Sequence, residues 1–534
     1  MIRIAMIYKK LYLILIFFLF VFVSCDRQID VAIEKGDYVF TDQSYGIRYY
    51  IKVDTVFGSN LDGRLYEVDD EPVMEMLPFN LEYHKRNMYV EFPGNKKVKL
   101  KYEYDKRNNI FVGWYIPEGE NKKVQYKIYK YIEPQFVIYD DSRYKRPCYD
   151  VNVKKNVIYG NVRGYWDSMA DDTINIGDVL KRGIFDAINK KNIDLKMDVY
   201  LPDDDTIKNR PLLMLIHGGA FFIGDKASLA MKKWCNYFAS LGYVCASINY
   251  RMGFKANTIS IERTAYEATQ DGHAAMRYLV HQADIYGIDT SKLFVGGSSA
   301  GSIIALNIAF MRNDNRPRSS YKVMLGHDLG DLESSGNKLN VDFNIKGVAN
   351  MWGGVSDINQ ISNANASIIS FHGDADSILP INYDYPFNLI GKMNRLFFNM
   401  IYGSECIDDM AEAMGLRHKL NVFHGRGHAL HLDYNRKLND DFYLIQNEIR
   451  DFFYDDIVHN PAVIVNVYDD NSFFSVDMTD VVTINWKVKG GFIVGNDNNG
   501  ITVSWFSDID EYEIQTAGCY SSGAAFYDSY VVKR

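Results

Sequence analysis

The pattern of apolar and polar positions divides the chain into three parts, of which the first alternates in the manner of β-strands. Residues 98–104 (VKLKYEY) place apolar and aromatic side chains on one face, and lysines with a glutamate on the other. Turn signals such as FPGN separate these runs. We therefore expect a small antiparallel β domain over residues 26–150.

In residues 151–458 apolar runs of strand length alternate with helical patterns. Residues 267–287 predict a helix that stops at Gly287. Alternation of this kind predicts a mostly parallel sheet covered by helices on both faces, and hence an α/β domain. The runs that predict its strands are PLLMLIHGG, YVCASINY, KLFVGG, IKGVANMWGG, SIISFHG and LNVFHG.

Residues 459–534 return to the β pattern. VVTINWKVKGGFIV and GITVSWF predict strands joined by a turn rich in Gly and Asn, with Trp486 and Trp505 in a sandwich core. The segment is long enough for one immunoglobulin-like domain. It resembles the PKD-like modules of bacterial surface proteins.

The N-terminus predicts a targeting segment. Arg3, Lys9 and Lys10 precede an apolar stretch over residues 11–23, which is too short to span a bilayer comfortably and is typical of a secretory signal peptide. The end of the predicted peptide (1–25), FVSC, resembles a bacterial lipoprotein cleavage site, although Phe22 replaces the usual Leu. We expect Cys25 to become lipidated and to anchor an exported protein to the bacterial membrane. Free secretion and a retained anchor helix are the alternatives.

Composition adds two limits to this picture. The 534 residues are 47% hydrophobic and carry a net charge of −9 with no long basic run, so we expect no nucleic-acid partner. The other cysteines show no metal-ligand spacing, and their disulfide pairing cannot be read from sequence. They are Cys148, Cys235, Cys245, Cys406 and Cys519.

The stretch LFVGGSSAGSIIALNI (293–308) predicts a strand, a very tight turn and a helix. Ser299 lies between Gly297 and Gly301 at the two-residue spacing that lets a strained turn lift a nucleophile clear of a sheet. Ser298 fits only a looser frame. We therefore expect Ser299 to be the nucleophile.

The motif HGGA (217–220) follows an apolar strand upstream of this serine. Small residues allow backbone N–H groups to approach the negative oxygen of a tetrahedral intermediate. We expect the N–H groups of Gly219, Ala220 and Ala300 to form an oxyanion hole, and His217 to prop the loop.

Two later loops supply a candidate acid and a candidate base. Asp374 and Asp376 follow one predicted strand, and His424, His428 and His431 follow the next. We expect Asp376 to be the acid, with Asp374 shaping its loop. Flanking glycines give the His428 loop freedom to reach the serine, so we expect His428 to be the base. We expect His424, directly after the strand, to be packed, and His431 to be a core or surface histidine of the following helix.

The chain order Ser299, Asp376, His428 is that of α/β-hydrolases. With HGGAFFIGDK, YVCASINYRMGF, EATQDGHAAMRYL and HGDADSILP, the central part resembles the carboxylesterase and lipase branch of that fold. The likeness is greatest to exported esterases of gut-type Bacteroidetes bacteria, some of which remove acetyl or feruloyl groups from plant polysaccharides. The resemblance implies a serine hydrolase of carboxylic esters that works through an acyl-enzyme and needs no cofactor and no metal.

Other interpretations remain open at this stage. A dipeptidyl-type serine peptidase shares the fold and the triad, but residues 26–150 are too few for its usual propeller. A catalytically idle adhesion protein is another. Residues 312–342 form either a surface excursion or a lid or pocket rim, and Arg251 and Asp271 are expected to brace the site. The flanking β domains are spacers or bind glycans.

Overall fold

The protein is described by a computed structural model. The predicted signal peptide and Cys25 lie outside the described residues. The model describes residues 36–532 except for segments 43–47, 58–59, 69–72, 75, 85–86, 93–95, 106–109, 117–120, 132–134, 170–188, 256, 323–325, 459–462, 469–471, 498–499 and 507–510.

The central domain is built on one sheet with the strand order β10-β11-β13-β12-β14-β15-β16-β19. The strand pairs from β13 to β19 are parallel, whereas β10 and β11 form an antiparallel edge. Among the inner strands, β13 and β16 are buried along their whole length and β12 is buried after its first residue, because helices cover both faces. Their bounds are β10 (Val151–Gly164), β11 (Lys191–Pro202), β12 (Arg210–Ile216), β13 (Val244–Ile248), β14 (Ile288–Ser298), β15 (Ile345–Met351), β16 (Ser367–Gly373) and β19 (His418–Phe423).

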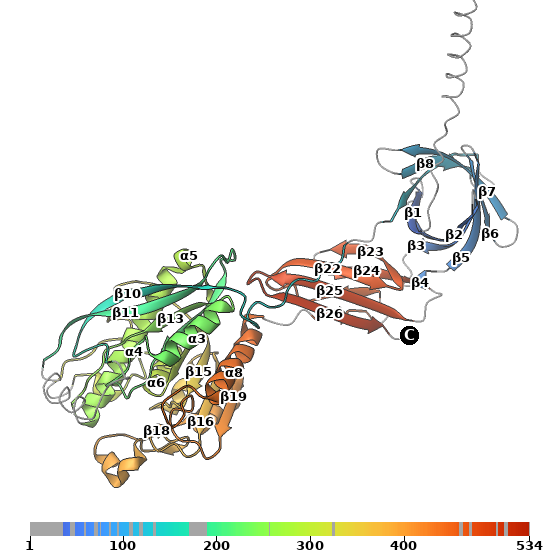
Figure 1. Ribbon diagram of the computed structural model, residues 1–534. Helices are drawn as coiled ribbons and strands as arrows, with labels where there is room; N and C mark the ends of the chain where they lie inside the picture. Colours follow the sequence, from blue (N-terminus) through green and yellow to red (C-terminus); the bar gives the residue numbers. More distant parts are fainter. Residues whose placement is uncertain are drawn as a thin grey trace, which may run out of the picture.

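Helices cover both faces of this sheet (Figure 1), and a cluster of apolar side chains packs between the helices and each face. One cluster joins α4, α6 and α7 to the sheet, and the other joins α3 and α8. This arrangement confirms the predicted α/β-hydrolase fold class. The helices are α3 (Leu229–Ser240), α4 (Thr258–His281), α5 (Ala283–Tyr286), α6 (Ala300–Phe310), α7 (Ser404–Ala413) and α8 (Asp440–Ile457).

The helix expected over 267–287 begins earlier than its apolar pattern indicates. α4 starts at Thr258 because the side chain of Asn257 accepts a hydrogen bond from the Ser260 N–H and caps the helix. At the other end α5 stops at Gly287, whose φ of 69° is in the left-handed region that favours glycine.

The C-terminal region forms two packed sheets, β20-β21-β24-β23 and β22-β25-β26. Trp486 and Trp505 are buried, as predicted. The run expected to be one strand is broken at Gly490, whose φ is 86°, so that β22 and β23 belong to different sheets. The bounds are β20 (Val465–Asn466), β21 (Phe473–Ser475), β22 (Val481–Lys489), β23 (Gly491–Asp497), β24 (Gly500–Phe506), β25 (Tyr512–Tyr520) and β26 (Ala525–Val532).

The N-terminal region is an antiparallel sheet that closes on itself, because β9 pairs back with β1. The short β4 (Val73–Met74) leaves this sheet and pairs with β24. Tyr50 packs against Phe492 and Phe506, with ring centroids 4.9 and 5.2 Å apart, so the first and last domains are in contact (Figure 1). The other strands are β1 (Gly36–Asp42), β2 (Arg48–Phe57), β3 (Asn60–Val68), β5 (Met76–His84), β6 (Asn87–Phe92), β7 (Lys96–Asp105), β8 (Ile110–Tyr115) and β9 (Val124–Lys130).

The segment around Tyr144 joins the central domain to the C-terminal sheets. Its N–H donates to the Leu241 carbonyl at 2.9 Å, and its hydroxyl donates to the Ser522 carbonyl at 2.7 Å. Next to it the buried Arg143 and Asp205 form an ion pair at 2.9 Å. The segment that leads from the first domain to the second is therefore hydrogen-bonded to the third domain as well.

Within the described part of the chain the cysteines are all free thiols, and they are the five from Cys148 to Cys519 named above. No helix among these residues is both long enough and apolar enough to cross a membrane.

Candidate active site

Ser299 lies at the junction of β14 and α6 in a strained backbone conformation. Its φ of 55° and ψ of −121° are sparsely populated by residues other than glycine. Its N–H donates to the Met351 carbonyl at 2.9 Å, which fixes the turn against β15. A Cβ at Gly297 would lie 2.3 Å from backbone atoms of Gly301, and one at Gly301 would lie 2.1 Å from the Ile216 carbonyl oxygen. Both glycines are therefore needed for the turn to close.

The structure brings Ser299, His428 and Asp376 together, as the sequence predicts. His428 Nε2 lies 2.9 Å from Ser299 Oγ, and His428 Nδ1 lies 2.6 Å from Asp376 Oδ2. The other carboxylate oxygen of Asp376 accepts hydrogen bonds from the N–H groups of Ile378 and Leu379, at 2.8 and 3.1 Å. The three side chains come from the ends of β14, β16 and β19, which is the edge where parallel strands gather chemistry.

The environment of Asp376 favours its ionised form. Burial by itself would raise the pKa of this carboxyl group, but hydrogen bonds from His372 and His428 outweigh burial and hold the pKa well below its usual range. Asp376 is therefore a carboxylate at neutral pH, able to orient His428 and to stabilise its protonated form. Because folding lowers this pKa, the group stabilises the fold above about pH 4 and loses that contribution as the pH falls further.

Two of the three residues expected to form the oxyanion hole lie beside Ser299. Ala220 and Ala300 line the pocket beside Ser299. Ala220 has a φ of 52°, and Ala300 is the first residue of α6, where backbone N–H groups have no partner inside the helix. Gly219 precedes Ala220 in the sequence but does not line the pocket, and its carbonyl accepts hydrogen bonds from the N–H groups of Phe222 and Ile223. Its role in the hole stays a prediction.

His217 props the loop that carries these donors. Its ring stacks on Tyr250 with centroids 4.6 Å apart, and its Nδ1 lies 2.8 Å from the Gly218 carbonyl oxygen. The Tyr250 hydroxyl donates to the His217 carbonyl at 3.0 Å. The residue thus contacts its own loop and the core, as expected for a structural histidine.

The remaining candidate residues have other partners than the Ser299, His428 and Asp376 side chains, or are buried. The expectation that His424 is packed is wrong, because its side chain is exposed in the loop after β19, where its Nδ1 lies 2.9 Å from Asp374 Oδ2. His431 stacks on Trp352 with centroids 5.1 Å apart, and burial lowers its pKa to about 4, so it is neutral at pH 7. Arg251, in the segment that follows β13, and the fully buried Asp271 of α4 form a bidentate ion pair. Ser298 is buried.

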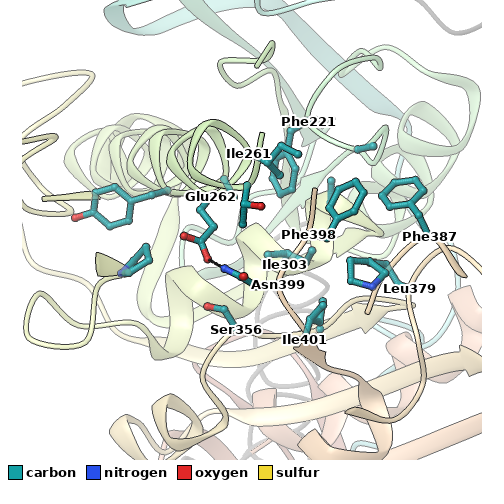
Figure 2. Close-up of a pocket in the computed structure, with 18 of the residues that line it drawn as sticks. Phe221, Ile261, Glu262, Ile303, Ser356, Leu379, Phe387, Phe398, Asn399 and Ile401 are labelled. Carbon is teal, nitrogen blue, oxygen red and sulfur yellow. Dashed lines mark hydrogen bonds between the residues drawn. The ribbon is translucent and has the colours of Figure 1, made fainter. Parts of the chain in front are cut away.

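A pocket extends from Ser299 along α6. Ala300, Ile303, Asn307 and Met311 line it at helical spacing, so it follows one face of α6 and its end over about 16 Å. Figure 2 shows Phe221, Phe387, Phe398 and other large apolar side chains around it. The side chains of Glu262 and Asn399 meet across it through a hydrogen bond (Figure 2).

The sequence pattern does not predict one wall of this pocket. That wall is formed by Pro386, Phe387 and residues 397–401, which lie on either side of η4 (Asn388–Leu396) and reach the start of β18 (Ile401–Tyr402). The run FNLIGKMNRLFFNMI is rich in apolar residues but has no regular spacing, since Gly391 interrupts it with a φ of 59°. The density of aromatic and apolar residues after Asp376 is the signal that could have identified it.

The excursion 312–342 contributes Pro317 to the pocket, and its described residues bond α4 and also β10, where Asn337 donates to the Tyr159 carbonyl. Arg263 donates to the Ser319 carbonyl at 2.7 Å, and Gln270 donates to the Leu329 carbonyl at 2.9 Å. It is therefore a surface excursion with one residue at the pocket rim. In the described residues no group of three or more His, Cys, Asp or Glu side chains is arranged to hold a metal ion.

Known proteins share sequence similarity with a fifth to a quarter of this chain. Relatives include the ethyl acetate hydrolase of Pseudomonas putida, 30% identical over 121 residues (22% of this chain, 36% of the relative), and the para-nitrobenzyl esterase of Bacillus subtilis, 32% identical over 118 residues (21% and 24%). Another is the 2-hydroxyisoflavanone dehydratase of Glycyrrhiza echinata, 28% identical over 138 residues (23% and 40%). This chain thus spans well under half the length of the curated relatives it matches.

Two of the solved structures that match this chain have low TM-scores. One described as "Truncated form of carbohydrate esterase from gut microbiota" is 17% identical with a TM-score of 0.36, covering 60% of this chain and 99% of that one. Esterase 2 of Thermogutta terrifontis, phosphorylated by paraoxon, is 20% identical with a TM-score of 0.36, covering 59% and 97%.

A family model matches the chain directly. Residues 197–368, which run from β11 into β16 and contain Ser299, match the family named BD-FAE. The central part of the chain therefore has the α/β-hydrolase fold and matches an esterase family of that fold, BD-FAE, over residues 197–368.

Proposed function

We propose that the protein is a serine hydrolase that cleaves carboxylic esters through an acyl-enzyme. The observation that carries this proposal is the chain of contacts from Ser299 Oγ through both nitrogens of His428 to Asp376. The match to an esterase family supports the same reaction. No cofactor takes part in it.

Each group has one step in the proposed reaction. His428 Nε2 accepts the proton of Ser299 Oγ as this oxygen attacks the ester carbonyl, and Asp376 stabilises the resulting imidazolium. The N–H groups of Ala220 and Ala300 then stabilise the negative oxygen. The proton passes from His428 to the leaving alcohol, and water repeats the sequence on the acyl-enzyme.

The pocket supports a large acyl group in this reaction. An acetyl group on Ser299 would fill only the part of the pocket beside the first turn of α6, near Ile303, whereas the pocket continues to Met311. Its walls are largely apolar and aromatic, and Glu262 and Asn399 provide polar atoms near Ile303 (Figure 2). Of the two acyl groups that the sequence suggests for a polysaccharide substrate, the pocket favours feruloyl over acetyl.

Replacing Ile303 with Trp should separate the two acyl groups. A bulky side chain one helical turn from Ser299 is expected to lower kcat/KM for methyl ferulate by about tenfold or more while changing that for p-nitrophenyl acetate by less than about threefold. Steady-state kinetics on the full-length chain measure both. Ile285→Trp, on the exposed part of α5, is the control and should change neither. Equal losses on the two esters in Ile303→Trp would contradict the pocket assignment.

We also propose that the mature protein is exported and held on a bacterial membrane by a lipid on Cys25. The N-terminal pattern supports this location. The full chain should sediment with membranes, and Cys25→Ser should release it into the soluble fraction. A Cys25→Ser chain that sediments as well as the wild type would argue against the lipid anchor. The C-terminal domain is proposed to be a PKD-like spacer.

A further inference from the structure

A continuous chain of buried side-chain hydrogen bonds runs beneath the catalytic residues. Its centre is Asn350, a fully buried residue near the end of β15. Ser302, in the first turn of α6, donates to Asn350 Oδ1 at 2.6 Å. The Asn350 amide nitrogen in turn donates to Ser404 Oγ at 3.0 Å and to Ser370 Oγ at 2.9 Å. These contacts join the helix that follows the nucleophile to the start of α7.

The chain continues from α7 to the loop of the catalytic acid through His372, also fully buried. His372 Nε2 lies 3.1 Å from the Leu379 carbonyl oxygen, and its Nδ1 lies 2.7 Å from Ser404 Oγ. A carbonyl can only accept, so Nε2 carries the proton and Nδ1 accepts from the Ser404 hydroxyl. The Nε2–H also faces Asp376 Oδ2 at 3.5 Å.

We propose that Asn350 and His372 are positioning residues that hold the acid loop in register with the nucleophile turn. This inference rests on the proposed function, because it assigns the two residues to the same reaction. Neither lines the pocket, so they act through other groups. His372 fixes the Leu379 carbonyl, and the Ile378 and Leu379 N–H groups of the same turn hold Asp376.

The donors and acceptors around Asn350 allow only one orientation of its side-chain amide. Asn350 Oδ1 accepts from Ser302 and from the Gly353 N–H, while its amide nitrogen donates to two serines, so no rotated amide satisfies the same partners. The space around it is filled, since a Cβ at Gly353 would lie 2.4 Å from Ser302 Oγ and 2.7 Å from Asn350 Oδ1. Removing the Ser404 hydroxyl leaves His372 Nδ1 without its partner, and removing the Ser302 hydroxyl takes one of two donors from Asn350 Oδ1. We expect the acid loop to shift in both cases.

The test removes one hydroxyl from each end of the chain. Ser302→Ala and Ser404→Ala are each expected to lower kcat for an activated ester by about tenfold with little change in KM, because binding is untouched while the acid is displaced. The double variant should lose less than the product of the two single losses, since both break one connected chain. Ser367→Ala is the matched control, because it removes a buried hydroxyl from the same strand as His372 that bonds Asp456 instead.

Thermal stability separates positioning from packing. All three variants are expected to lower Tm to a similar degree, but only Ser302→Ala and Ser404→Ala should lower kcat. If those two variants keep kcat within about twofold of the wild type while Tm falls, the chain is purely structural and the proposal is wrong.

Hydrogen exchange gives a readout that does not depend on ester hydrolysis. Ser302 lies at the opposite end of the hydrogen-bond chain from the acid loop. Ser302→Ala should nevertheless speed hydrogen exchange of the Ile378 and Leu379 amides in the full-length protein, whereas Ser367→Ala should not. Unchanged exchange in Ser302→Ala would overturn the inference. A wild-type chain that hydrolyses no ester but shows the expected exchange would instead overturn the proposed function alone.

Discussion

Ser299→Ala is expected to abolish labelling by a fluorophosphonate probe and to lower ester hydrolysis by about a thousandfold or more. The probe reacts only with a serine whose proton can be removed, and His428 Nε2 lies 2.9 Å from Ser299 Oγ. Ala300, whose N–H is assigned to the oxyanion, follows Ser299 directly. Labelling of the full-length chain, read by in-gel fluorescence, measures the first effect, and steady-state rates measure the second.

Ser298→Ala is the control for this variant. Ser298 is the last residue of β14 and is buried, and its carbonyl and hydroxyl oxygens face Gly218. Its removal should weaken labelling by a few-fold at most, through a small shift of the turn. Full labelling in Ser299→Ala with loss in Ser298→Ala would move the nucleophile by one residue and refute the site described here.

The strands of the central sheet and the residues at their ends were predictable because one physical rule links them. Strands buried on both faces must be apolar throughout, so they stand out in the sequence. The polar residues that follow them, such as Ser299, Asp376 and His428, then meet at the carboxyl edge of a parallel sheet. The positions of these residues directly after predicted parallel strands therefore indicate that they meet, although they lie 52 to 129 residues apart in the sequence.

The walls of the pocket and the chain beneath it were not predictable in this way. Segment 386–401 has no period, because a 3₁₀ turn with a kink at Gly391 repeats neither a helix nor a strand. Asn350 and Ser404 are single polar residues whose partners are set by tertiary packing. No local pattern distinguishes them from the many polar residues that face solvent.

The arrangement of the β domains was also beyond the sequence pattern. Alternation shows that residues 26–150 and 459–534 form strands, but not which apolar surfaces meet. The pairing of β4 with β24 and the packing of Tyr50 on Phe492 depend on contacts between opposite ends of the chain. Gly490 likewise divides an unbroken apolar run between two sheets, through a positive φ that composition does not reveal.

Asp376→Asn is the second change expected to have a large effect, a loss of kcat of about a thousandfold to ten-thousandfold. The carboxylate accepts from His428 Nδ1 at 2.6 Å and from two backbone N–H groups. An amide in its place presents an NH₂ group toward a donor or turns the imidazole to the wrong tautomer, so Nε2 can no longer accept the proton of Ser299. KM should change little, because Asp376 does not line the pocket.

Asp374→Asn is the matched control, two residues away in the same loop. Asp374 accepts from the Gly425 N–H at 2.6 Å and faces the exposed His424, so its loss should cost less than about threefold in kcat. Rates of the two variants on one activated ester, with circular dichroism to verify folding, give the comparison. Asp376 is excluded as the acid if both variants lose the same activity or if Asp374→Asn loses more. The ratio between the two variants thus reports which of two neighbouring carboxylates orients His428.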